Sequence, residues 1–95
     1  MDISLNANRV VITGNIKSIQ DYKTIKETLE RVVENEKRVV VEIVDSISMT
    51  SSVIGYLNKL VQKDGITLEL HVGSSTLIDL LKDLNLMELL RVRAL

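Results

Sequence analysis

The chain has 95 residues and no cysteine, with 12 basic and 13 acidic side chains that give a formal net charge of −1. This length predicts a single domain, residues 1–95, with one core, and the lack of cysteine excludes disulfides and thiol chemistry. The charges are interspersed and tyrosine is the only aromatic residue type, so we expect no nucleic-acid partner. No apolar run reaches membrane-spanning length and no signal-peptide pattern opens the chain, so we expect no direct membrane insertion and a cytoplasmic location.

The first residues predict a β-hairpin. Residues Asp2 to Leu5 alternate polar and apolar side chains, as a short half-buried strand does. Asn6-Ala7-Asn8 is typical of a turn, and the β-branched run from Arg9 to Thr13 predicts the second strand. Gly14-Asn15 ends that strand.

A first helix is predicted next. Ser18 and Asp21 have the spacing of a capping box, with Asp in place of the usual Glu. Apolar residues then recur at spacings of three and four, which places them on one face of a helix. These residues are Tyr22, Ile25, Leu29, Val32 and Val33. Asn35-Glu36-Lys37 closes the helix.

The middle of the chain predicts a buried strand, a polar turn and a second helix. Val39 to Val44 is apolar except for Glu42, as in a central strand. Hydroxyl side chains crowd the turn at Ser46, Ser48, Thr50, Ser51 and Ser52. The helix begins at Thr50 to Ser52, and Gly65 ends it. Its predicted inward residues are Val53, Ile54, Leu57, Leu60 and Val61.

The last part of the chain predicts a strand with one wet face and a third helix. Between Ile66 and Val72, apolar residues alternate with Thr67, Glu69 and His71. Gly73-Ser74-Ser75 forms the turn and cap of a helix that ends at Asn85 in a left-handed conformation. Its predicted inward residues are Leu77, Leu80, Leu81 and Leu84. Leu86 to Val92 is compatible with a last helical turn or with a short final strand.

Together these elements predict a small α/β fold. The order β-β-α-β-α-β-α, with or without a terminal strand, implies parallel crossovers after an antiparallel hairpin. We therefore expect a small mixed β-sheet with the helices mainly on one face.

The residues that could carry chemistry are few. His71 stands alone on a polar strand face, so we expect a solvated histidine and no metal site. No Gly-x-Ser-x-Gly motif or glycine-rich phosphate loop is present. We therefore expect no enzyme and no cofactor.

The hydroxyl cluster is the remaining candidate, and it has two interpretations. A helix N-terminus carries unpaired N–H groups and a partial positive charge. Thr50 or Ser51 could serve simply as the N-cap of the second helix, or a hydroxyl there could accept a phosphate that the helix end then stabilises.

The stretch from Val39 to Leu57 resembles the core motif of STAS domains, the anti-sigma-factor-antagonist fold. In that family a hydrophobic strand leads into an Asp-Ser-Ser-Gly-type turn, which reads Met49-Thr50-Ser51-Ser52-Val53-Ile54-Gly55 here. Gly14-Asn15-Ile16-Lys17 is similar to the family's Gly-Glu-Leu-Asp. Val72 to Leu90 is similar to its last helix and leucine-rich exit, so the resemblance covers nearly the whole chain.

This resemblance implies a regulatory protein-interaction module. The unphosphorylated form would bind an anti-sigma factor that is itself a serine kinase, and phosphorylation of Ser51, or alternatively of Thr50, would break that complex. The partner-binding residues would be Thr50, Ser51, Ser52, Tyr56, Lys59 and Lys17. Tyr56 has two interpretations, an exposed aromatic anchor or an ordinary half-buried tyrosine.

Three positions depart from the family's pattern. Thr50 and Lys17 stand where acidic residues are usual, and Val53 replaces a glycine. The alternative function is a non-catalytic cytoplasmic STAS subunit that docks on the ATPase of a lipid-transport ABC system and is not switched.

Overall fold

The β-branched segments form one five-stranded sheet, whose strand order follows the order in the chain. The computed structural model describes all residues, 1–95. Strands β1 (Asp2–Asn6) and β2 (Arg9–Thr13) form the antiparallel hairpin. Strands β3 (Arg38–Ile43), β4 (Thr67–Val72) and β5 (Val92–Ala94) run parallel to β2. The predicted mixed sheet is confirmed, and the final strand is present.

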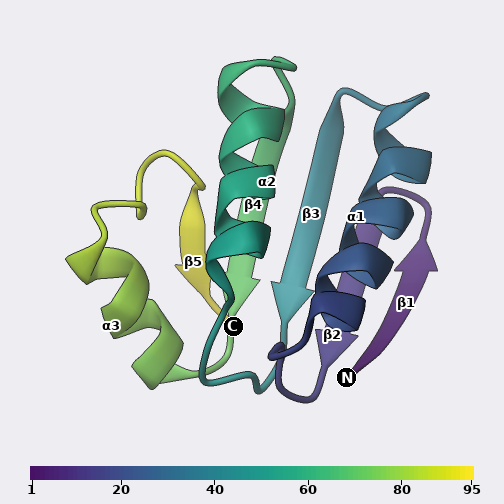
Figure 1. Ribbon diagram of the computed structural model, residues 1–95. Helices are drawn as coiled ribbons and strands as arrows, with labels where there is room; N and C mark the ends of the chain where they lie inside the picture. The colour runs from purple at the N-terminus through teal and green to yellow at the C-terminus, as the bar shows by residue number, and fades with distance from the viewer.

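Three helices cover one face of this sheet (Figure 1). They are α1 (Ile19–Val33), α2 (Ser51–Gln62) and α3 (Ser75–Asp83), and none is both long and apolar enough to cross a membrane. All three begin at the edge where the parallel strands end, at the bottom of Figure 1. The loops that precede the helices therefore gather at the carboxyl ends of β2, β3 and β4.

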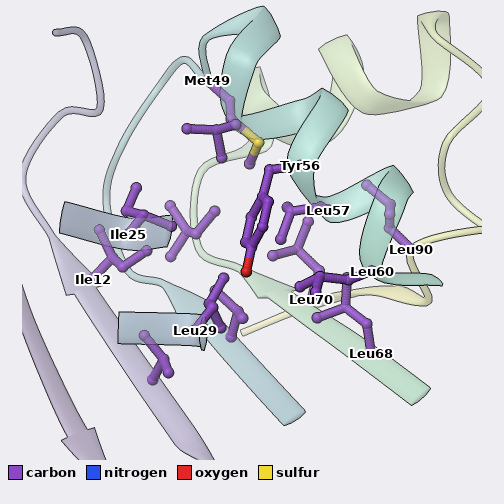
Figure 2. Close-up of a cluster of buried hydrophobic side chains, with 14 of the residues drawn as sticks. Ile12, Ile25, Leu29, Met49, Tyr56, Leu57, Leu60, Leu68, Leu70 and Leu90 are labelled. Carbon is purple, nitrogen blue, oxygen red and sulfur yellow. The ribbon is translucent and has the colours of Figure 1, made fainter. Parts of the chain in front are cut away.

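The core lies between the helices and the covered face of the sheet. Alternate strand residues such as Ile12, Val41 and Leu70 are at most 1% exposed, while their strand neighbours face outward. Figure 2 shows the helix residues Leu29 and Leu57 in the same buried cluster as Ile12 and Leu70. Burying each such side chain stabilises the fold by roughly 1.5–3 kcal/mol. The opposite face of the sheet carries no helix, which explains the wet face predicted for β4.

Local caps begin the helices where the sequence predicts. The Ser18 hydroxyl accepts a hydrogen bond from the N–H of Asp21 at 3.0 Å. The Asp21 carboxylate in turn accepts from the N–H groups of Lys17 at 3.0 Å and Ser18 at 3.2 Å, which lowers the pKa of Asp21. This capping box is confirmed. Asn85 adopts a positive φ of 58°, as predicted for the residue that ends α3.

One expectation about the C-terminal part was wrong, and one open alternative is resolved. Leu84 is 48% exposed rather than inward, because α3 ends at Asp83 and the chain turns away there. For Leu86 to Val92, the sequence left open a last helical turn or a short final strand, and the structure contains a turn followed by a strand. Residues 86–91 make a turn in which the N–H of Leu90 donates to the carbonyl of Leu86, and β5 follows.

Candidate docking site

Two loops at the carboxyl ends of the strands are tied together by a buried serine. Ser46 lies in the β3–α2 loop, residues 44–50, and is completely buried. Its hydroxyl accepts from the N–H of Ile16 at 3.0 Å and donates to the carbonyl of Ser48 at 2.7 Å. Ile16 belongs to the β2–α1 loop, residues 14–18. Ser46 is therefore a structural residue within the predicted hydroxyl cluster.

Three more hydrogen bonds join the same loops. The N–H of Gly14 donates to the Asp45 carboxylate at 2.8 Å, and the N–H of Ile47 donates to the Asn15 side chain at 3.2 Å. The Ser48 hydroxyl donates to the carbonyl of Ile16 at 3.4 Å. Because these bonds satisfy backbone groups that regular structure leaves free, they hold both loops in one conformation. We call the surface formed by these two loops and the first turn of α2 the docking edge.

The β4–α3 loop is pressed against the docking edge from the other side. The N–H of Gly73 donates to the carbonyl of Ile43 at 2.9 Å. A Cβ atom at Gly73 would lie 2.0 Å from the carbonyl oxygen of Val44, so only glycine fits there. The sequence marks Gly73 as a turn residue but gives no sign of this close approach, because Val44 is distant in the chain.

The three hydroxyls at the start of α2 have different environments. The Thr50 hydroxyl accepts from the N–H of Val53 at 3.3 Å, so Thr50 is the N-cap and the capping interpretation applies to it. Ser51 and Ser52 occupy the first two helical positions and are exposed. Neither of their hydroxyls has a hydrogen-bond partner within the chain, while the Ser46, Ser48 and Thr50 side chains are all engaged. Ser51 and Ser52 are therefore the accessible hydroxyls of the cluster.

Tyr56 is not part of this surface. The prediction of an exposed aromatic anchor is wrong, and the residue is buried more deeply than the half-buried alternative. Its side chain points into the core in Figure 2, and the residue is 6% exposed. The flank of α2 that carries Tyr56 faces α1, so the buried stripe of α2 is rotated from the predicted one and Ile54 is only half-buried. Burial, with contributions from the nearby carboxylates of Glu30 and Asp64, raises the pKa of Tyr56 to about 12.

The two predicted lysines lie in separate places. Lys59 is exposed on α2, with its ammonium 3.2 Å from the Asp64 carboxylate and 6.0 Å from the centre of the Tyr56 ring. It is two helical turns beyond Ser51, so it lies away from the docking edge. Lys17 is exposed in the β2–α1 loop and belongs to the docking edge. Of the predicted partner-binding residues, the structure groups Lys17, Thr50, Ser51 and Ser52.

Sequence reasoning missed the exposed apolar side chains of this end of the molecule. Of the six large hydrophobic residues that are exposed, four follow the carboxyl end of a parallel strand: Ile19, Val44, Ile47 and Leu95. Ile47 is 57% exposed and is fixed beside Asn15 by its backbone N–H. Exposed apolar residues that lie together within a polar rim mark interaction surfaces, and Val44 and Ile47 share the β3–α2 loop. Their signal in the sequence is weak, because Ile47 stands alone between two serines.

His71 lies on the uncovered face of the sheet, as predicted, but it is half-buried rather than solvated. Its Nε2 atom is buried without a hydrogen-bond partner and lies 3.6 Å from a carboxylate oxygen of Glu69. The same oxygen lies 3.6 Å from Nε of Arg93 on β5. No group of three or more acidic or histidine side chains is placed to hold a metal ion.

Comparisons with protein-family models, with curated proteins and with solved structures found no match to this chain.

Proposed function

We propose that this chain is a regulatory protein-interaction module of the anti-sigma-factor-antagonist type, which binds a kinase or anti-sigma partner through the docking edge. Phosphorylation of Ser51 releases that partner. The observation that carries the proposal is the environment of Ser51, which is exposed at the first position of α2 with an unengaged hydroxyl. The resemblance of residues 39–57 to the STAS core motif supports it.

The charge at the start of α2 suits a phosphate. The first N–H groups of a helix lack helical partners, and the helix dipole favours negative charge there. The first turn of α2 contains no acidic residue that would repel a phosphate. A phosphoryl group on Ser51 is therefore compatible with the fold, since it adds charge where the helix end stabilises it.

The same phosphate would disfavour a bound partner. Ile47 and Val44 expose apolar side chains on the loop that leads into α2, and a partner that buries them must also remove water from the start of the helix. A dianion on Ser51 raises the cost of that dehydration unless the partner supplies a cation. Phosphorylation thus changes the docking edge without unfolding it.

Thr50 is the less favourable acceptor. Its hydroxyl already caps α2 through the N–H of Val53, and the residue is half-buried. A kinase would have to displace this hydrogen bond before reaching the oxygen. Ser51 requires no such rearrangement.

The absence of an acidic residue beside Ser51 favours the second candidate, a constitutive subunit that docks on a transporter ATPase. Acidic residues at the Thr50 and Lys17 positions are usual in switched members of the family that the chain resembles. A subunit that is never phosphorylated has no use for them, while the exposed Ile47 would still serve docking.

The test compares the partners captured by matched variants. Tagged wild type, Ser51→Ala, Ser51→Asp and Ile47→Asp are expressed in the native cells, and bound proteins are identified by quantitative mass spectrometry. We expect a kinase-like ATPase with wild type and Ser51→Ala, at least about tenfold less with Ser51→Asp and Ile47→Asp, and phosphate on Ser51. A transporter ATPase held equally by both Ser51 variants indicates the second candidate. Equal capture of a partner by wild type and Ile47→Asp would contradict docking at this edge.

A further inference from the structure

The two outer edges of the sheet are protected very differently. Strand β5 has only three residues, follows Arg91 and carries Arg93, and short edges with charged residues resist pairing with other chains. Strand β1 has five residues, no basic residue, no proline and no bulge, since its register with β2 is unbroken from Asp2 to Asn6. Figure 1 shows no element beyond β1. Strand β1 is therefore an open edge.

Hydrogen bonds from the β3 side of the sheet establish which backbone groups of β2 face the hairpin partner β1. The carbonyls of Asn8 and Ile12 accept from the N–H groups of Val40 and Val44, at 3.0 Å each. Residues that alternate with Asn8 and Ile12 in β2, such as Val11, therefore point their backbone groups toward β1.

The register carries this pattern across to β1. Ser4 lies opposite Val11, so its N–H and carbonyl face β2. Its neighbours Ile3 and Leu5 alternate with it and point their N–H and carbonyl groups away from the sheet. The side chain of Leu5 is 44% exposed on the helix-covered side of this edge. The open edge thus offers the free backbone N–H and carbonyl groups of Ile3 and Leu5 together with the exposed side chain of Leu5.

We propose that this edge binds a second copy of the chain, with the two β1 strands antiparallel and Ser4 on the twofold axis. In this register Ile3 lies opposite Leu5 of the second copy, so their outward backbone groups are mutual partners and Leu5 is covered. Asp2, the only charged residue of β1, lies opposite the neutral amide of Asn6. The edge is therefore self-complementary, and the pairing creates a continuous ten-stranded sheet from two five-stranded sheets.

This dimer leaves the docking edge free. The twofold axis reverses the direction of the second sheet, so the docking edges of the two copies lie at opposite ends of the pair. The proposal of dimerisation can therefore be wrong while the proposed function is right, and the reverse. The experiment on β1 needs no partner protein.

The first measurement is the molar mass by light scattering from low micromolar to near-millimolar concentration. We expect the mass to rise from 10.7 kDa toward twice that value for wild type. Leu5→Lys places a charge on the edge and should remain monomeric, as edge lysines do in natural sheets. Leu84→Lys is the matched control, since Leu84 is exposed to a similar degree but lies after α3, and it should dimerise like wild type.

The second measurement fixes the register with single cysteines, because the chain has none of its own. Across the proposed axis the two Ser4 Cα atoms lie roughly 4.5 Å apart, the separation of a non-hydrogen-bonded pair. That is within the range of about 4.4–6.8 Å for a disulfide, so Ser4→Cys should form a disulfide-linked dimer under mild oxidation. Asn6→Cys is the control, since its two copies lie roughly 13 Å apart.

The outcomes separate the alternatives. Amide exchange of Ile3 and Leu5 should slow at least about tenfold at high concentration in wild type and remain fast in Leu5→Lys. A wild-type mass of one chain at near-millimolar concentration, with fast exchange at both amides, would overturn the proposal and leave the edge to an extended segment of another protein. Equal dimerisation of Leu5→Lys and wild type, or cross-linking of Asn6→Cys as fast as Ser4→Cys, would overturn it too.

Discussion

The hydroxyl of Ser46 accepts a hydrogen bond from the backbone N–H of Ile16 at 3.0 Å, across thirty residues of sequence. Both groups are buried, so neither is satisfied by water. This bond connects the two loops of the docking edge from within, beneath the exposed side chains of Ile47 and Ser51. The conformation of the docking edge therefore depends on a serine that is completely buried.

Ser46→Ala should destabilise the fold by about 1–3 kcal/mol, because it leaves the N–H of Ile16 buried without a partner. Urea unfolding followed by circular dichroism gives the free energy of unfolding. Ser52→Ala is the matched control and should stay within about 0.5 kcal/mol of wild type, since the Ser52 side chain is exposed and unbonded. Equal effects of the two variants would show that the Ser46 bond is not structural.

Two glycines should respond to alanine in opposite directions. Gly73→Ala drives a Cβ against the Val44 carbonyl and forces the backbone to shift, so we expect a loss of about 2 kcal/mol or more. Gly55→Ala places a methyl group in open space within α2 and should stabilise the fold by about 0.5–1 kcal/mol. The midpoint of thermal unfolding should therefore fall below that of wild type for Gly73→Ala and rise above it for Gly55→Ala. If Gly73→Ala left the stability unchanged, that would refute the close approach of the β4–α3 loop to Val44.

Thr50 and Ser51 at the start of α2 should contribute differently to stability. Thr50→Ala removes the N-cap hydrogen bond to Val53 and should cost about 1 kcal/mol of unfolding free energy. Ser51→Ala removes a hydroxyl without a partner and should change it by less than about 0.5 kcal/mol. Chemical denaturation of the purified variants measures both. A larger loss for Ser51→Ala than for Thr50→Ala would contradict the assignment of Thr50 as the N-cap.

The phenol of Tyr56 should make stability fall at high pH. Its pKa is about 12 in the folded chain and about 10 in the unfolded chain, so the folded state holds this proton more tightly. The contribution is complete below about pH 10 and is lost as the pH rises toward about 12. Tyr56→Phe should abolish this part of the decline, while Tyr22→Phe should keep it. Unfolding free energies measured across this pH range test the prediction, and identical profiles for the two variants would contradict the raised pKa of Tyr56.

The elements that local chemistry determines were predicted closely. The hairpin follows from the alternation in Asp2 to Leu5 and the β-branched run after Asn8, and the capping box at Ser18 begins α1 where expected. The alternation in β4 also identified the uncovered face. These features depend on residues that are neighbours in sequence, so the local sequence pattern is enough to predict them.

The features that were missed depend on contacts between distant segments. Tyr56 is buried because α1 lies beside that flank of α2, and helical periodicity alone cannot choose between the two flanks of an apolar stripe. Ser46 and Ser51 belong to the same hydroxyl cluster in the sequence, yet Ser46 is buried and hydrogen-bonded to Ile16, while Ser51 is exposed. The sequence thus singled out the hydroxyl cluster as a candidate site, but its division into structural and accessible hydroxyls required the fold.

The four hydrogen bonds between the loops of the docking edge have a consequence for binding rates and affinity. Association normally requires surface loops to become ordered, and that entropy is subtracted from the strength of the complex. Here the two loops are already ordered by folding, so little of that entropy remains to be lost on binding. For the proposed complex, this lowers the entropy cost of binding, so a smaller contact area would suffice.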